Sequence, residues 1–552
     1  MHHHGASAGT GAFSRDVSGL PSEVETPELR LDDGEDLELT IAPVALEIAG
    51  RPVRMLAYNG SIPGPTLRVR QGSEIVVHVS NQADVEATVH WHGLRLENRY
   101  DGVPHDTQKP IPVGGDFTYR VRFPDEGLYW YHPRIREDYT QDSGLYGNIV
   151  VDPATPDHFP PCDREVVLTL DDILIEDGQP ASYDRAGPDH TAMGRFGNVL
   201  LIGGREDPTL SVARNEVVRL FLTNTANTRV FNVALPGGLM KLIGGDSGRY
   251  EREVMVEEVL LAPSERAIVD VLFERDGEVR LEHRTPDDTY VLATITVAGN
   301  GASSSAASFA TLRENAELVA ERARLQPEID RAPDQTLAFV AEMDMATSEP
   351  RDDLAPDAPR FACPMDPEIV SVEPSRCPIC GMKLLPIELV PAALERLADG
   401  GTGHDDEHGG AHHAGHAAGL IEWEDTMEDV NRSTNLSNMR WFVVDRATGK
   451  RNAEIDWSFT VGDRVKIRLV NEMASDHPMH HPFHIHGAGR FLVLTRDGVV
   501  EPNLVWKDTV LVKTGEVVDI LLDVSNPGLW MAHCHIAEHA ESGMMFSFNV
   551  AR

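Results

Sequence analysis

The chain has 552 residues, with 49 Lys and Arg against 88 Asp and Glu, so its formal net charge is −39 with neutral histidine. Such a charge disfavours nucleic acids and anionic membranes as partners, because like charges repel. With 41% apolar and 25% charged residues, the composition is that of a globular protein, and the length suffices for three or four domains. No apolar run is long enough to span a bilayer.

The N-terminal residues 1–30 are predicted to be a disordered segment or tag. Residues 1–18 are rich in Gly, Ala and His and lack the apolar stretch of a signal peptide. We therefore expect either that a leader was removed or that the protein is not exported. His2–His4 resembles a cloning remnant.

The rest of the chain has the pattern of β-strands. Ile75, Val77 and Val79 alternate with other residues, as in a half-buried strand, and short apolar runs recur between Gly, Pro and Asn. Many short strands separated by turns indicate sandwiches or barrels. The clearest helical pattern covers residues 311–325.

Two sequence elements each occur three times. The first reads QGSEIVVHVSN, RNEVVRLFLTN and VGDRVKIRLVN, and the second reads FPDEGLYWYH, FERDGEVRLEH and DVSNPGLWMAHCH. The third copies come about 100 residues later than the spacing of the first two predicts, so we expect inserted material before them. The prediction is an all-β fold of three homologous β-sandwiches with an insert before the third. The predicted boundaries are domain 1 at 31–157, domain 2 at 158–300, a linker at 301–360, the insert at 361–386, a His-rich linker at 387–419 and domain 3 at 420–552.

Three histidine motifs point to metal binding. On a strand, alternate side chains share a face, so both histidines of a His-x-His pair can ligate a metal. The motifs are HWHG with His90 and His92, HPFHIHG with His481, His484 and His486, and HCHIAEH with His533, Cys534, His535 and His539. In the last motif, the Cys534 side chain lies on the opposite face from its two neighbours, so one strand can serve two metal sites.

One thiolate, two imidazoles and a weak axial methionine form the ligand set of a blue-copper centre. Cys534, His481, His539 and Met544 supply this set. The remaining histidine pairs offer only nitrogen, which suits copper that handles dioxygen. The middle repeat has VFNVALPG and LEHRT at the equivalent positions, so a shared cluster must lie between the first and third sandwiches.

These motifs, with WKDTV at 506–510 and MAHCHIAEHAESGMM at 531–545, resemble those of three-domain multicopper oxidases of the laccase type, above all the bacterial copper-efflux (cuprous) oxidases. The resemblance covers residues 31–298 and 421–552. It implies cupredoxin-like Greek-key domains, four coppers per chain and a periplasmic or secreted location. It also implies oxidation of phenols, aromatic amines or Cu(I) at a type 1 copper, coupled to reduction of dioxygen to water at a trinuclear cluster.

The resemblance also implies roles for individual residues. Cys534 would ligate type 1 copper and pass electrons along its strand to the cluster. Asp101, in the loop YDGVPHDTQ, would relay protons, although an Asp before Gly is also a common turn residue. The implied cluster ligands are His90 and His484 for type 2 copper, His92, His132 and His535 for one type 3 copper, and His486, His533 and residue 134 for the other.

Residue 134 departs from the family pattern WYHxH, because this chain reads YWYHPR with Arg134 at the last position. Arginine stays protonated and has no lone pair for copper. We expect that type 3 copper to be weakly bound or absent, and dioxygen reduction to be impaired, while the blue centre survives. Two readings stay open: an oxidase with a recent or engineered His-to-Arg change, and a copper-binding or sequestering protein with vestigial activity. Nitrite reduction is disfavoured, because the other trinuclear motifs are present.

The insert FACPMDPEIVSVEPSRCPICGMKLLP resembles the short heavy-metal-binding domain of copper-export proteins, which usually has His in place of Asp366. Its soft donors suit Cu(I); they are Cys363, Cys377, Cys380, Met365 and Met382. A zinc knuckle is the alternative if Asp366 or a histidine supplies a fourth ligand. The next tract is a candidate copper collector or a solvated linker, and its histidines are His404, His408, His412, His413 and His416. Cys162 is expected to be a free thiol.

Overall fold

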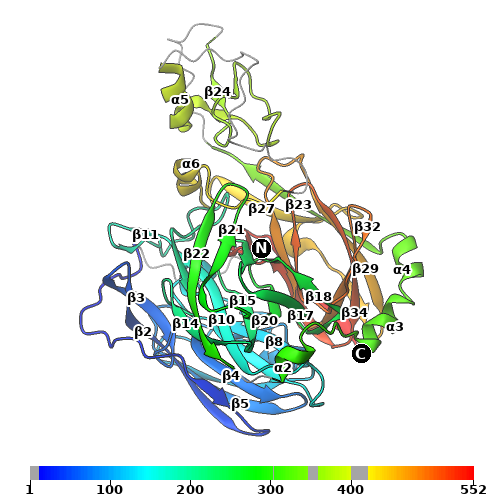
Figure 1. Ribbon diagram of the computed structural model, residues 1–552. Coiled ribbons are helices and arrows are strands. Elements are labelled where there is room, and N and C mark those ends of the chain that lie inside the picture. The colour runs from blue at the N-terminus through cyan, green and yellow to red at the C-terminus, as the bar shows by residue number, and fades with distance from the viewer. Residues whose placement is uncertain (1–10, 302–303, 346–357, 399–419) are drawn as a thin grey trace.

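The computed structural model describes residues 11–301, 304–345, 358–398 and 420–552. Three β-sandwiches pack into one body, and the insert extends from the third sandwich (Figure 1). The predicted all-β fold class is confirmed, because each repeat forms two facing sheets. No helix in the described ranges is both long and apolar enough to cross a membrane.

The first sandwich holds the first histidine pair on its inner sheet. One sheet has the order β3 (Arg51–Tyr58), β2 (Asp36–Ile48), β5 (Glu74–Asn81), β7 (Asp116–Arg122). The other has the order β1 (Glu28–Arg30), β4 (Gly64–Arg70), β9 (Gly147–Asp152), β8 (Gly127–His132), β6 (His90–His92). The predicted alternation is confirmed, since Ile75, Val77 and Val79 are all buried. β6 and β8 are antiparallel with His90 opposite His132, which places both on one sheet.

The second sandwich repeats this architecture without the histidines. Its six-stranded sheet has the order β13 (Val199–Ile202), β10 (Arg164–Ile173), β15 (Val217–Asn224), β20 (Arg266–Leu272), β17 (Leu239–Gly245), β18 (Gly248–Val256). Its five-stranded sheet has the order β14 (Thr209–Arg214), β22 (Thr289–Asn300), β21 (Gly277–Arg284), β16 (Phe231–Ala234), β19 (Glu258–Leu261). A hairpin joins β11 (Ile175–Glu176) to β12 (Gln179–Pro180). The pairing of β16 with β21 corresponds to that of β6 with β8, as the repeat predicts.

The third sandwich begins earlier than predicted, and the predicted linker at 301–360 is wrong in part. One sheet has the order β27 (Met439–Asp445), β23 (Gln335–Met343), β29 (Arg464–Asn471), β34 (Val517–Val524), β31 (Gly489–Arg496), β32 (Val499–Val500). The other has the order β28 (Ser458–Thr460), β36 (Met545–Ala551), β35 (Gly528–Cys534), β30 (His481–Ile485), β33 (Thr509–Val512). Because β23 lies between β27 and β29, the insert interrupts the third sandwich after its first strand.

The insert is a small unit with three two-residue strands, β24 (Phe361–Ala362), β25 (Val370–Ser371) and β26 (Leu385–Pro386), and the helix α5 (Pro391–Ala398). Its buried residues are continuous with the core of the third sandwich. The tract with the five histidines 404–416 lies outside the described residues. The 3-10 turns are η1 (Asn98–Tyr100), η2 (Ile387–Leu389) and η3 (Asn452–Glu454).

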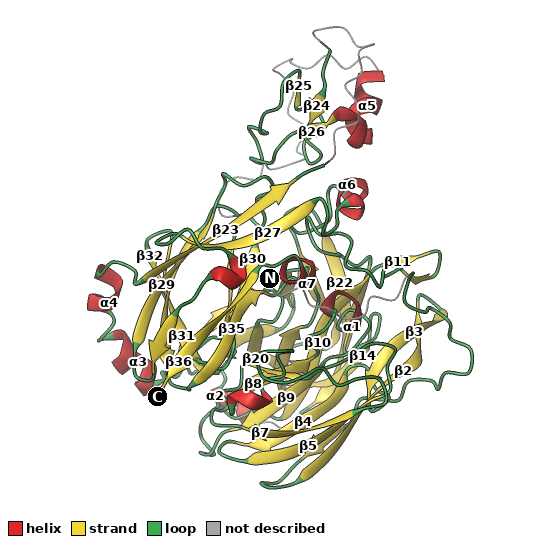
Figure 2. Ribbon diagram, turned by 180° about the vertical axis from the view of Figure 1, so that it is seen from behind, coloured by secondary structure: helices red, strands yellow, loops and turns green. Residues whose placement is uncertain are grey.

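Short helices lie in the connections between strands. They are α1 (Glu137–Thr140), α2 (Ser305–Ser308), α3 (Ala316–Arg322), α4 (Gln326–Asp330), α6 (Glu428–Ser433) and α7 (Ala537–Glu541). Of these, α2, α3 and α4 lie between the second and third sandwiches. The helix predicted at 311–325 is shorter, because the Asn315 side chain caps α3 by accepting a hydrogen bond from the Glu317 backbone. α1 and α7 lie side by side where the first and third sandwiches meet (Figure 2).

The predicted disorder of residues 1–30 is wrong for the part that the structure describes. Phe13 is buried and stacks on Tyr139, with ring centroids 3.8 Å apart. Residues 28–30 form β1, which pairs with β4. The composition of residues 1–18 suggested a tag, but one aromatic side chain with a binding partner is enough to anchor this segment.

Candidate metal centres

The predicted blue-copper residues meet at the end of two neighbouring strands. Antiparallel pairing sets Phe483 of β30 opposite Cys534 of β35, and α7 follows directly with His539. The Cys534 sulfur lies 3.5 Å from His481 Nδ1 and 3.6 Å from His539 Nδ1, and all three side chains are fully buried. Met544 is also buried, and its backbone pairs with Cys534 and His539.

The chemistry of these donors fits a metal. Burial lowers the pKa of His481 and His539, so both rings are neutral and keep a lone pair. Burial raises the pKa of the Cys534 thiol, so without a nearby cation the sulfur stays protonated. A metal ion would therefore displace a proton from Cys534 when it binds.

Seven further histidines form a second buried cluster between the first and third sandwiches. They are His90, His92, His132, His484, His486, His533 and His535. Burial lowers the pKa of His92, His132, His486, His533 and His535, and lowers that of His484 to about 3. These six imidazoles are therefore neutral and keep lone pairs that can bind a metal.

The ring nitrogens of five of these histidines face each other in two groups. His132 Nε2 lies 3.4 Å from His92 Nδ1 and 3.3 Å from His535 Nε2. His486 Nε2 lies 3.2 Å from His533 Nε2. These are the two sets that the resemblance implies for the type 3 coppers, without residue 134.

His90 and His484 are the residues implied for type 2 copper. In each ring, one nitrogen is held by a hydrogen bond and the other makes none. His90 Nδ1 donates to the Asp101 carbonyl at 2.7 Å, and His484 Nδ1 donates to the Asp508 carbonyl at 2.9 Å. Within the described part of the chain, Nε2 of both rings is buried without a hydrogen-bond partner. Since a buried polar atom without a partner is costly, these two nitrogens fit the role of metal ligands.

Asp101 belongs to the histidine cluster as well as to a turn. It follows η1, and its carboxylate is fully buried. Oδ2 accepts a 2.8 Å hydrogen bond from His486 Nδ1, and Oδ1 lies 3.4 Å from His90 Nδ1. Asp101 therefore orients two of the proposed ligands, His486 through its carboxylate and His90 through its backbone carbonyl.

The second sandwich reaches the cluster through a residue that the sequence analysis missed. Arg266 of β20 donates two hydrogen bonds to Asp508, at 2.7 and 2.6 Å, and Asp508 Oδ1 accepts one from His92 Nε2 at 3.0 Å. Burial would raise the pKa of Asp508, but Arg266 and His484 hold it below its usual value. Nothing local in the sequence signals Arg266, because its partner is 242 residues away.

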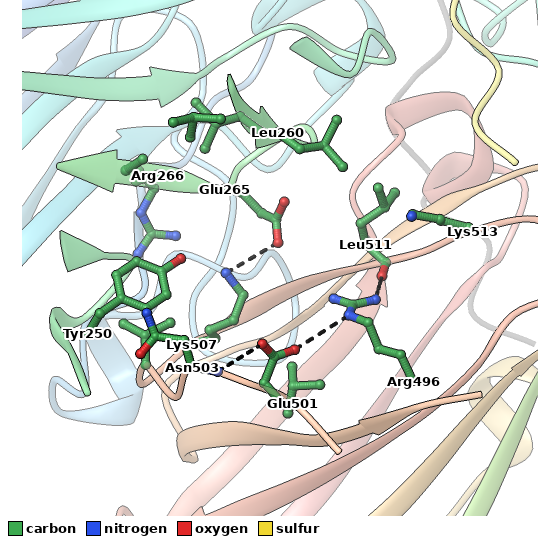
Figure 3. A pocket seen from close by; sticks show the side chains of 15 residues that line it. Tyr250, Leu260, Glu265, Arg266, Arg496, Glu501, Asn503, Lys507, Leu511 and Lys513 are labelled. Carbon is green, nitrogen blue, oxygen red and sulfur yellow. Dashed lines mark hydrogen bonds and ion pairs between the residues drawn. The ribbon is translucent and has the colours of Figure 1, made fainter. Parts of the chain in front are cut away.

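A polar cavity borders this network between the second and third sandwiches. Lys507, next to Asp508, lies 3.2 Å from Glu265 (Figure 3). Its amine also lies 3.2 Å from the Asp246 carboxylate. Arg266 lines the same cavity. Two cations, Arg266 and Lys507, therefore lie next to Asp508, and each is paired with a carboxylate.

Arg134 lies beside the cluster, as its sequence position implies. Its side chain is buried, pairs with Glu137 and donates to the Met531 sulfur at 3.1 Å. Burial lowers the pKa of His533 most, and the positive charge of Arg134 lowers it further. Burial raises the pKa of Glu137 to about 7, although Arg134 opposes the shift.

In the insert, four donor side chains gather in one buried group: Cys363, Cys377, Cys380 and Asp366. Met365 is buried, whereas the sulfur of Met382, which was grouped with the cysteines in the prediction, lies 3.3 Å from His477 Nδ1 of the third sandwich. Cys162 is a free, half-buried cysteine, as predicted, and burial raises its pKa to about 11.

Comparisons with known proteins agree with this architecture. Family models described as Multicopper oxidase match residues 40–156 and 424–552, and one described as Heavy metal binding domain matches 360–387. The Mycobacterium tuberculosis protein Multicopper oxidase MmcO is 26% identical over 96% of this chain and 90% of its own length. Copper resistance protein A of Pseudomonas syringae is 34% identical, over 28% of this chain and 24% of its own.

Solved structures show the same fold. The Campylobacter jejuni multicopper oxidase, titled a metallo-oxidase, has a TM-score of 0.64 with 22% identity and covers 97% of both chains. The Aquifex aeolicus McoA oxidase has a TM-score of 0.63 with 21% identity over 97% of this chain and 100% of its own. This chain therefore belongs to the multicopper oxidases, copper-dependent oxidoreductases that use dioxygen, and it carries a heavy-metal-binding domain inside its third sandwich.

Proposed function

We propose that this oxidase takes electrons from phenols, aromatic amines or Cu(I), and that Arg134 impairs its reduction of dioxygen. Bound copper would supply the one-electron oxidation of the reductant and the four-electron reduction of dioxygen to water. The rest of the mechanism concerns what the side chains of this chain hold and orient.

Cys534, His481, His539 and Met544 are proposed to hold type 1 copper. The supporting observation is the buried triangle of sulfur and two Nδ1 atoms, at 3.5 and 3.6 Å. His533 and His535 flank Cys534 in sequence but belong to the other cluster, so the backbone of three residues joins the two centres. This short covalent link is the proposed path for electrons.

The three histidine sets are proposed to hold type 2 copper at His90 and His484 and the type 3 coppers at the remaining histidines. The backbone carbonyls of Asp101, Pro133, Asp508 and Cys534 each accept a hydrogen bond from one ring nitrogen, which leaves the other nitrogen free for a metal. The tautomers are therefore set before a metal arrives.

Asp101 is proposed to supply protons to the reduced oxygen. Its Oδ2 accepts from His486, while Oδ1 makes no hydrogen bond within the described residues. Oδ1 is thus the atom that can take up and release a proton at the cluster. Reduction of one dioxygen consumes four protons, so a positioned carboxylate has a defined task.

Arg134 carries the proposed impairment. His486 and His533 form a set of two where the family implies three ligands, and the third position holds a guanidinium that cannot ligate. A buried cation also repels the metal ion beside it. Of the four coppers of the intact family, we propose that the one at His486 and His533 binds weakly or is absent.

A second candidate is a copper-binding protein with vestigial oxidase activity. It is favoured by the way in which Arg134 is accommodated, because Glu137 compensates its charge and Met531 accepts its hydrogen bond. A position adapted to arginine in this way fits a native residue as well as a recent change.

The test compares dioxygen uptake of the copper-loaded chain and its Arg134→His variant, with a phenol and then with Cu(I). Arg136→His is the matched control, because Arg136 pairs with Asp138 on the same turn. Uptake only in Arg134→His supports the impaired oxidase. Equal uptake with and without the change shows that the assignment of residue 134 is wrong, and two blue but inactive proteins support the copper-binding reading.

A further inference from the structure

The insert builds a four-donor site that uses none of the ligands proposed for the type 1, type 2 and type 3 coppers. Cys363 Sγ lies 3.4 Å from Cys380 Sγ and 3.4 Å from Asp366 Oδ2, and Cys377 Sγ lies 3.1 Å from Asp366 Oδ2. All four side chains are buried. With bonds of about 2.3 Å to sulfur and about 2.0 Å to oxygen, a tetrahedral zinc ion needs donor separations of about 3.5 to 3.8 Å. The observed separations are slightly shorter, so the four donors would have to move apart only slightly to hold a zinc ion between them.

The donor types select between metals. Cu(I) prefers soft thiolate and thioether ligands, whereas Zn(II) accepts thiolate and carboxylate together. The thioether of Met382 contacts His477 of the third sandwich at 3.3 Å, and the fourth position of the thiol group is occupied by Asp366 instead. Three thiolates and one carboxylate, all buried, form a closed four-coordinate site of the structural kind.

Backbone hydrogen bonds also point at the sulfur atoms. The Asp366 N–H lies 3.3 Å from Cys363 Sγ, and the N–H groups of Ile379 and Cys380 lie 3.4 and 3.5 Å from Cys377 Sγ. Such donors stabilise a thiolate more than a thiol. This arrangement is what metal-bound cysteines require, and it is independent of the distances among the four donors.

Apart from the side chains that pack on the core of the third sandwich, the insert has little regular structure to hold it together. Its three strands have two residues each. Units this small usually need a metal or disulfides to fold, and the structure shows its cysteines as free. An ion bound by residues from both ends of the segment would supply that stability.

The insert packs on the chain that leads to His481. Arg376 pairs with Asp476 at 2.8 Å, and the Lys383 backbone donates to the Asp476 carbonyl at 2.9 Å. Met382 contacts the next residue, His477. An ordered insert therefore restrains residues 476–477, shortly before a proposed type 1 ligand.

We propose that Cys363, Asp366, Cys377 and Cys380 bind one structural Zn(II), which orders the insert and through it the stretch at 476–477. The ion is separate from the coppers and takes no part in electron transfer. Asp366 is thus a metal ligand at the position where related domains have histidine.

The test measures the metal content of the full chain after loading with equal zinc and copper. We expect one zinc per chain, retained in Cys162→Ser, which changes a cysteine outside the insert, and lost in Cys380→Ser. Asp366→His should keep the zinc because histidine is also a zinc ligand, whereas Asp366→Ala should lose most of it. Copper instead of zinc in the insert, or full zinc in Cys380→Ser, overturns the proposal.

Two readouts remain informative if Cys380→Ser does not fold. Co(II) exchanged into the unchanged chain should give the visible absorption of a tetrahedral thiolate site, and its absence counts against the proposal. Hydrogen exchange at residues 476–477 should be faster in Asp366→Ala than in Asp366→His. Equal exchange in the two variants contradicts the proposed ordering effect.

Discussion

The contact between Arg266 and Asp508 gives the sharpest test of how the second sandwich supports the cluster. Replacing Arg266 by methionine keeps an apolar stem of similar width but removes both hydrogen bonds to Asp508. Asp508 is 2% exposed, so its carboxylate would be left buried without its cation. Removing one partner of such a pair costs about 3–5 kcal/mol.

The cost should depend on both partners. In the variant Arg266→Met/Asp508→Asn no charge is left unpaired, so we expect the double variant to be more stable than Arg266→Met alone. Denaturant unfolding at neutral pH measures this coupling in four metal-free proteins: the parent, Arg266→Met, Asp508→Asn and the double variant. Arg284→Met is the control, because the Arg284 pair with Glu282 is part-exposed.

The same change should affect the metal centres unequally. Asp508 orients His92, whereas the proposed type 1 ligands, all in the described part of the chain, make no hydrogen bond or ion pair with Arg266 or Asp508. Copper in the histidine cluster should therefore fall while the blue absorption persists. A loss of less than about 1 kcal/mol in Arg266→Met, or strictly additive effects in the double variant, would refute the reasoning.

Three further predictions concern single side chains. Cys534→Ser should abolish the blue absorption and leave the copper of the histidine cluster in place, as absorption and metal analysis would show. In the Arg134→His background, Asp101→Asn should slow dioxygen uptake about 10²- to 10⁴-fold without loss of copper, and a similar loss of copper would mean that Asp101 only orients ligands. Burial raises the pKa of Asp142 to about 7, so its ionisation weakens the folded state as pH rises from about 4 to about 7. Asp142→Asn should therefore gain thermal stability relative to the parent at pH 8 but not at pH 4, and the same difference at both pH values would contradict the shift.

The histidine motifs were readable from the sequence because their geometry is local. At the end of β35, two-residue periodicity alone separates Cys534 from His533 and from His535, the residue after the strand. In β6 the same periodicity places His90 and His92 together. The strand β23 was missed for the opposite reason. It is one short apolar run in a region of helices and acidic turns, and only its pairing with β27 and β29 shows that it belongs to the third sandwich.

The side chains that complete each centre were harder to predict. Asp366 differs from the related domains, so its role depends on a distance to Cys377 that the sequence does not contain. Met382 has the right chemistry for a copper ligand, yet its sulfur lies on His477. Arg266 stands in a sandwich without ligand motifs, and only the packing of domains brings it to Asp508.

These long-range contacts explain why a ligand-free sandwich belongs to the catalytic unit. Besides Arg266, the second sandwich supplies Asn227, whose side chain accepts from the Ala537 backbone and donates to Glu538 at 2.6 Å. Those residues begin the helix that carries His539. The second sandwich therefore braces the proposed type 1 ligands at one point and the histidine cluster at another. Because both contacts involve buried polar groups, a shift of this domain would leave them unsatisfied, so the position of the second sandwich and the geometry of both metal centres stabilise each other.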